Sequence, residues 1–273
     1  MKAVLLLNML LVFTFGSVCS QQLSTNKKEA QPAIVAIFPS ADTLPANLLR
    51  MYIQFSYPMK TSGNLERIQV QDDGGNEVEG AIFNNAYELW NTEQTLLTIL
   101  FDPSRVKTGL RSHETRGRAL QPGRRYHLVM DPLQDVEERS TTAITRSFYV
   151  READFSAPDK AHWTIEKPKA GSRKPLIIHF PQMLDWLSLQ QRLMLTDASQ
   201  QPVEGEVVIR DAEKEWYFKP TEPWSDQPYT LFIHGRLEDP SGNNLNGLFD
   251  HEMGSLKNTR EGVIETITLR FEK

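Results

Sequence analysis

Apolar and polar residues alternate one by one along many short stretches of this chain. The stretches "MYIQF" (51–55), "IQVQD" (68–72), "LIIHF" (176–180) and "LMLTD" (193–197) all carry apolar side chains at every second position. Successive side chains of a strand point to opposite faces, so each stretch would bury one face and expose the other. The pattern predicts half-buried β-strands.

These stretches occur twice, in the same order. Residues 51–82 correspond to residues 176–207 without a gap, at an offset of 125. Within them, the turn "DDGGNEVEG" (72–80) matches "DASQQPVEG" (197–205). Beyond this stretch, the offset between the two copies becomes smaller. The later matched pairs are "ILFDP" (99–103) with "WYFKP" (216–220), "RYHLVMD" (125–131) with "PYTLFIH" (228–234), and "TRSFYV" (145–150) with "VIETITLRF" (263–271). The chain therefore reads as two copies of one unit.

Turn-forming stretches such as "LQPGRR" and "DPSGNN" separate the predicted strands, as in antiparallel all-β domains. We predict two tandem Ig-like antiparallel β-sandwiches, at residues 31–152 and 163–273, joined by a short, stiff linker at 153–162. Only "PQMLDWLSLQQRL" (181–193) has a pattern that could form one or two helical turns.

The segments "IQFSYPM", "VQDDGGNEVEG" and "LQPGRRYHLVMD" resemble the bacterial Ig-like domains of surface-layer proteins and other exported proteins. The second copy departs from the pattern, with "FPQML" in place of the "FSYPM" form. The resemblance implies an Ig-like fold and a role as a spacer, an adhesion module or a part of an envelope assembly. It brings no catalytic residue and no cofactor, so we expect a protein that is not an enzyme.

The N-terminus reads as a secretory signal. Residues 1–20 contain Lys2, an apolar run and small residues before Gln21, while residues 21–30 read as a flexible segment. No second long apolar run follows, which argues against a transmembrane segment. Cys19, the only cysteine, is either a lipid-accepting residue or an incidental part of the signal. We expect export to the periplasm, the outer membrane or the cell exterior.

The net charge of −5 argues against general nucleic-acid binding. One segment, 105–125, is nevertheless strongly basic, with Glu114 as its single acidic residue. Its basic residues are Arg105, Lys107, Arg111, Arg116, Arg118, Arg124 and Arg125. Because guanidinium groups bind carboxylate and phosphate in a forked geometry, we predict an anionic partner: an envelope protein, an anionic glycan or a lipid headgroup. The alternative is a solvated loop whose arginines pair with the protein's own acidic surface.

Two further patterns indicate binding sites. Asp239, Ser241 and Asn243 have the spacing that begins a calcium loop, although the later glutamate is missing and a β-turn explains the stretch equally well. Trp90 and Trp224 lie in loop-like sequence and are candidates for stacking on sugars, which makes a carbohydrate-binding or carbohydrate-active module the alternative function. A passive spacer without a ligand is a third hypothesis.

Overall fold

The computed structural model describes residues 30–84, 87–250 and 262–272, and residues 31–273 form one compact unit. The predicted signal peptide (1–20), Cys19 and all of the 21–30 segment except Ala30 lie outside the described residues. Within the described part of the chain, no helix has the length and apolar composition that crossing a membrane requires.

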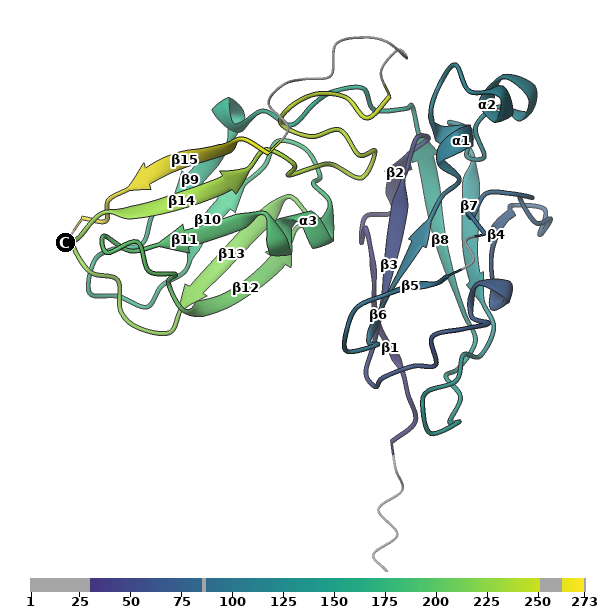
Figure 1. Cartoon of the computed structure of the whole chain (residues 1–273), viewed down its shortest axis with the longest axis horizontal. Coiled ribbons are helices and arrows are strands. Elements are labelled where there is room, and N and C mark those ends of the chain that lie inside the picture. The colour runs from purple at the N-terminus through teal and green to yellow at the C-terminus, as the bar shows by residue number, and fades with distance from the viewer. Residues whose placement is uncertain (1–29, 85–86, 251–261, 273) are drawn as a thin grey trace, which may run out of the picture. The chain divides into compact units, whose positions relative to one another are not determined.

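The described strands form four sheets, two for each copy (Figure 1). In the first copy, one sheet has the order β1 (Ile34–Phe38), β3 (Arg50–Phe55), β6 (Leu96–Leu100) and β5 (Leu89–Trp90). The facing sheet has the order β2 (Thr43–Pro45), β8 (Ile144–Arg151), β7 (Arg125–Met130) and β4 (Ile68–Asp72). All neighbouring strands are antiparallel except β2 and β8, which are parallel.

The second copy repeats this arrangement with longer pairing at one edge. One sheet has the order β12 (Gly205–Arg210), β13 (Glu215–Pro220), β10 (Leu176–His179) and β9 (Thr164–Glu166). The other consists of β11 (Leu193–Thr196), β14 (Tyr229–His234) and β15 (Ile264–Leu269). The helical turns are η1 (Leu65–Arg67), α1 (Pro103–Val106), α2 (Arg111–Arg116), η2 (Lys160–His162) and α3 (Trp186–Gln191). The predicted all-β fold with two Ig-like sandwiches is confirmed, and α3 lies where one or two helical turns were expected.

Alternate side chains of these strands build two apolar cores, as the sequence pattern predicted. Met51 and Ile53 lie in the first core, and Leu176 and Ile178 lie in the second, all without measurable exposure. Burying a side chain of this size stabilises the fold by about 2 kcal/mol. The cores explain why each copy keeps its alternation although their loops differ.

One predicted correspondence is wrong by two residues. Met51 pairs with Ile99, whereas its counterpart Leu176 pairs with Phe218, so Ile99 corresponds to Phe218 and not to Trp216. The shared Phe-x-Pro ending of the two segments favoured the wrong alignment. Because strand side chains alternate with a period of two, this shift leaves every residue on the same face, and the predicted burial was unaffected.

The repeated turn has one hydrogen-bond pattern, which occurs four times in the part of the chain that the structure describes. An aspartate Oδ1 accepts from the backbone N–H groups two and four residues later, at 2.8–3.0 Å, in the turns of Asp72, Asp135, Asp197 and Asp239. The fourth residue has a positive φ in each turn: Gly75 (78°), Glu138 (68°), Gln200 (62°) and Gly242 (81°). This shared network explains why both copies end a strand in the same way.

The turn after Asp239 also contacts the first copy. Ser241 Oγ donates to Asn47 Oδ1 at 2.9 Å, and Asn243 Nδ2 donates to the carbonyl of Asp154 at 3.0 Å. Asp154 belongs to the predicted linker and exchanges two further hydrogen bonds with Asn47, at 2.7 and 2.8 Å. The first linker residues are thus bonded to both copies.

Buried carboxyl groups lie at the same joint. Tyr52 donates to Asp185 Oδ2 at 2.8 Å, and Arg50 Nη1 lies 2.8 Å from Glu238 Oε1. Burial raises the pKa of Asp185, and it raises the pKa of Glu238 to about 7, although the positive charge of Arg50 opposes both shifts. One arginine therefore faces two carboxyl groups, and the pair holds a proton more readily than either group would in water.

Two glycines in equivalent turns test the joint. A Cβ added to Gly75 would meet nothing within 4 Å, whereas one added to Gly242 would lie 2.8 Å from Leu49 Cδ2. Replacing either glycine by alanine should destabilise the protein by about 1 kcal/mol, since a positive φ disfavours a side chain. Gly242→Ala should lose more stability than Gly75→Ala in urea denaturation, because the added Cβ would collide with Leu49. Equal losses would contradict the packing of this turn on the first copy.

The carboxyl groups of the joint predict a pH dependence. A folded-state pKa near 7 for Glu238, above the ordinary 4.5, means that the folded protein binds more protons than the unfolded chain between these values. Stability should therefore fall as the pH rises from about 5 to 7.5, by roughly 2 kcal/mol for this group. Glu238→Gln should flatten the dependence of the melting temperature on pH in this window. The exposed control Glu222→Gln should leave it unchanged, and identical curves for the two variants would refute the prediction.

Candidate functional site

The predicted basic segment folds into α1 and α2 between β6 and β7. Asp102 caps α1, because its Oδ1 accepts from the N–H of Ser104 at 2.9 Å, and Pro103 begins the helix where no N–H is needed. Gly117 ends α2 and donates its N–H to the carbonyl of His113 at 2.8 Å. The expected long loop thus contains two helical turns, which hold its side chains in fixed directions.

Arg105 supports this local fold. It is buried, its Nε donates to the carbonyl of Gly117 at 3.0 Å, and its Nη1 donates to the carbonyl of Glu79 at 2.8 Å. Burial lowers the pKa of Arg105, and the positive charge of Arg116 lowers it further. The prediction that Arg105 belongs to an anion-binding surface is wrong, because its guanidinium joins α1 to the end of α2.

The chain before the second copy's last strand contributes to this region. Asp250 Oδ1 accepts from the N–H and the hydroxyl of Thr108, at 3.0 and 2.9 Å, and its Oδ2 lies 3.6 Å from Arg118 Nη2. The Nζ of Lys107 lies 4.3 Å from the ring centroid of Phe249. Neither Phe249 nor Asp250 could be identified from the sequence, because each meets a segment more than a hundred residues earlier and no local pattern marks that contact.

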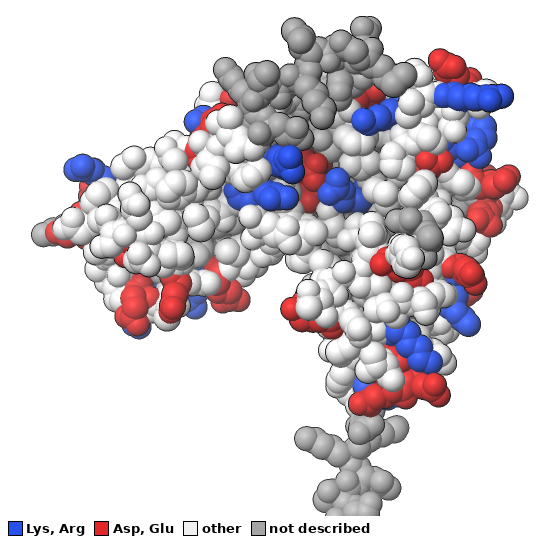
Figure 2. Space-filling view, viewed as in Figure 1, with Lys and Arg blue, Asp and Glu red and all other residues white. Residues whose placement is uncertain are grey.

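The remaining arginines lie in two places. Arg111 and Arg116 are exposed on α2, and among the described residues neither guanidinium group forms a hydrogen bond or an ion pair. Arg125 lies at the start of β7, with its guanidinium 4.6 Å from the ring centroid of Tyr149. Arg124 adjoins it, and its positive charge helps the backbone N–H of Asn76 to lower the pKa of Asp72. The seven predicted residues thus do not form a single binding surface, and Figure 2 shows basic and acidic side chains interspersed over the visible face.

A groove of about 560 Å³ lies beside α1 and α2. It combines cations, hydroxyl groups and apolar side chains. The residues that supply them are Lys107, Arg116, Ser104, Ser112, Phe83, Leu110 and Phe249. Asp102 also lines the groove, but its Oδ1 is bonded to the first turn of α1. The groove can bind an anionic group through its cations while its rings and Leu110 contact an apolar body.

The structure places the two tryptophans differently from the sequence prediction. Trp224 is buried at 2% exposure, packs against Phe271 at a centroid distance of 4.8 Å, and donates Nε1 to the carbonyl of Lys174 at 2.7 Å. The prediction of an exposed stacking platform at Trp224 is therefore wrong; loop-like sequence around it concealed a core position. Trp90 is half-buried, and its Nε1 donates to Glu88 Oε2 at 2.9 Å.

The stretch from Asp239 to Asn243 forms the turn described above. Asp239 Oδ1 accepts from the N–H groups of Ser241 and Asn243, and its Oδ2 accepts from Asn243 Nδ2 at 2.9 Å. Burial raises the pKa of Asp239 to about 7, and the hydrogen bond from Asn243 opposes that shift. The β-turn that was the alternative interpretation is present, and its hydrogen bonds account for the alternate spacing of Asp239, Ser241 and Asn243.

Comparisons with known proteins give similarities to solved structures alone. No protein-family model matches the chain, and no curated protein matches it. The N-terminal part of the bacterial S-layer protein SbsC is 9% identical, with a TM-score of 0.31, over 90% of this chain and 45% of that one. The titin Ig tandem A164–A165 is 9% identical, with a TM-score of 0.24, over 84% of this chain and 90% of that one. This chain spans less than half the length of the SbsC structure.

Substitutions of Arg105 and Arg111 distinguish an arginine that supports the fold from one that is available for binding. Arg105→Ala should destabilise the protein by about 2–3 kcal/mol, because it leaves the carbonyls of Gly117 and Glu79 without their donors. Arg111→Ala, at an exposed site in the same segment, should change stability by less than about 0.5 kcal/mol. Urea denaturation of both variants measures the difference. Equal stabilities would show that Arg105 does not hold α1 and α2 together.

Proposed function

We propose that this is a non-enzymatic, exported surface or envelope protein that binds an acidic segment of a partner protein in the groove beside α1 and α2. The observation that carries this proposal is the composition of the groove. Lys107 and Arg116 line it together with Phe83, Leu110 and Phe249. Cations next to apolar side chains suit a ligand that carries both carboxylates and apolar groups.

The two cations have different environments in the groove. Arg116 is exposed, and among the described residues its side chain forms no hydrogen bond or ion pair, so its forked donors are available to a carboxylate. The Nζ of Lys107 lies over the ring of Phe249, so its positive charge is held next to the apolar lining of the groove. Arg111, at the other end of α2, can add a longer-range attraction. On a protein with a net charge of −5, this local positive charge would orient an acidic partner.

The apolar lining favours a peptide over a sulfated glycan or a lipid headgroup. Phe83 is 39% exposed, a large apolar surface that a polar ligand would leave in water. An acidic peptide with leucine or phenylalanine beside its carboxylates would cover that ring and pair with both cations.

Export of the protein belongs to the same proposal and rests on the signal pattern of residues 1–20. Attachment of a lipid at Cys19 remains a prediction within it.

Binding of a defined peptide tests this function. A fluorescein-labelled peptide of alternating Glu and Leu should bind the full chain, and Lys107→Gln/Arg116→Gln should weaken binding at least tenfold in fluorescence anisotropy at low salt. The matched control Lys167→Gln/Lys169→Gln removes two exposed positive charges from the second copy and should bind like the parent. Raising the salt concentration should weaken the parent complex without abolishing it, because the apolar contacts persist.

Two competitors distinguish the source of the anion. A sulfated oligosaccharide and anionic phospholipid vesicles should displace the peptide poorly, since neither covers the apolar lining. The proposal of an acidic protein segment would be overturned if either competitor displaced the peptide at the same concentration of negative charges. It would also be overturned if the two charge variants bound the peptide equally well.

A further inference from the structure

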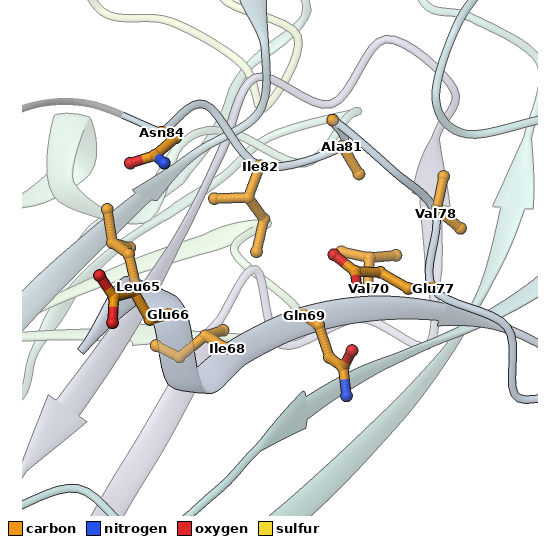
Figure 3. Close-up of a pocket in the computed structure, with 11 residues that line it drawn as sticks. Leu65, Glu66, Ile68, Gln69, Val70, Glu77, Val78, Ala81, Ile82 and Asn84 are labelled. Atoms are coloured by element: carbon orange, nitrogen blue, oxygen red, sulfur yellow. The ribbon is translucent and has the colours of Figure 1, made fainter. Parts of the chain in front are cut away.

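A second cleft lies at the edge of the first sandwich. β4 is the last strand of its sheet, and the chain that follows the Asp72 turn pairs with it at one position, Gln71 with Glu77. That chain then leaves β4 and joins the other sheet, where Ile82 pairs with Phe101. Between β4 and the departing segment lies a space of about 320 Å³, into which Ile82 points (Figure 3).

Two backbone groups of β4 are left without a partner in this space. The N–H of Asp131 donates to the carbonyl of Arg67, so alternate residues 67, 69 and 71 face β7, and Ile68 and Val70 face the open edge. The N–H of Ile68 donates to Leu65, and the carbonyl of Val70 accepts from Val78 at 2.7 Å. The carbonyl of Ile68 and the N–H of Val70 have no protein partner among the described residues.

The walls of the cleft are apolar and its rim is acidic. Six lining residues have apolar side chains: Leu65, Ile68, Val70, Val78, Ala81 and Ile82. Glu66 and Glu77 lie at the rim, both exposed, and among the described residues neither forms an ion pair. None of the described residues that line this cleft is basic. Its charge is therefore opposite to that of the groove beside α1 and α2, and the two sites share no lining residue.

We propose that the cleft binds an extended segment of a partner protein, which adds to β4 as a further strand. The segment donates a backbone N–H to the carbonyl of Ile68 and accepts from the N–H of Val70, which satisfies both open groups. Its alternate side chains enter the apolar cleft, and the intervening ones face Glu66 and Glu77. The occupant is thus a strand in which apolar residues alternate with lysine or arginine.

The second copy has the same kind of edge: β11 takes the place of β4, and the carbonyl of Leu195 accepts from the N–H of Val203 as that of Val70 accepts from Val78. There, the chain after the Asp197 turn forms β12, which pairs with β13 over six residues from Gly205 to Arg210. In the first copy, the corresponding stretch makes one bridge at Ile82, and β5 pairs with β6 at two residues. These pairings belong to the sheets that face β4 and β11, so they alter the far wall of the cleft and cover neither edge strand.

Methylated peptides test the backbone pairing directly. An acetylated hexapeptide of alternating Lys and Val is the probe, with two derivatives N-methylated on either all valines or all lysines. Alternate residues of an added strand bond to β4, so one derivative should lose binding at least tenfold and the other should bind like the parent peptide. The amide of Val70 should become protected from hydrogen exchange when the parent peptide binds. Equal affinities of both derivatives, or an unprotected Val70, would overturn the proposal.

Charge variants test the rim while leaving the backbone intact. Glu66→Gln/Glu77→Gln should weaken binding of the parent peptide by about three- to tenfold. The control Glu204→Gln/Glu206→Gln makes the same charge change at exposed positions around the start of β12 and should have no effect. Equal weakening by both pairs would mean that the peptide responds to net charge alone, which would contradict a site at this edge. Neither pair touches the groove beside α1 and α2, so this result is independent of the proposed function.

Discussion

The hydrogen bonds from backbone N–H groups to the aspartate at the head of each turn set the course of this chain. Each of the four aspartates fixes where the chain turns, and Asp72 and Asp197 do so directly at the ends of β4 and β11. In the first copy, the turn of Asp72 brings Val78 back to β4 for a single contact and then releases the chain toward the other sheet. The open edge beside Ile68 and Val70 follows from that geometry. The same network, at Asp239, presents Ser241 and Asn243 to the first copy.

The joint between the copies connects to the basic groove through one continuous piece of chain. Residues 238–243 supply Glu238 and the turn that contacts Asn47, and a few residues later Phe249 and Asp250 reach Lys107 and Thr108. The groove is therefore built by both copies, although its cations all come from the first. Glu238, whose pKa burial raises to about 7, and Phe249 of the groove wall therefore belong to the same stretch of chain. Burial of two carboxyl groups near one arginine is costly, and the hydrogen bond from Tyr52 offsets part of that cost.

The sequence was informative where a side chain's environment follows from its own neighbours. Alternation predicted the strands and the burial of Met51 and Leu176, and even a two-residue error in aligning Ile99 kept the correct face. The segment 105–125 is distinctive by its charge, and the Asp102-Pro103 start and the Gly117 end of its helical turns are capping signals that the sequence contains. Arg105 and Trp224 could not be placed correctly, because burial by chain distant in sequence decides their exposure. Asp250 was missed for the same reason.

Both candidate sites lie on a connection or at an edge of the first sandwich. The groove arises from the inserted turns α1 and α2, and the edge cleft lies between β4 and the segment that reaches the other sheet at Ile82. The shared cores impose the same packing on both copies, so they restrict variation to connections and edges. There, an insertion adds charge and an edge strand leaves backbone groups open. Because the lining of one site is basic and the rim of the other is acidic, the two would select partners of opposite charge while resting on the same pair of sheets.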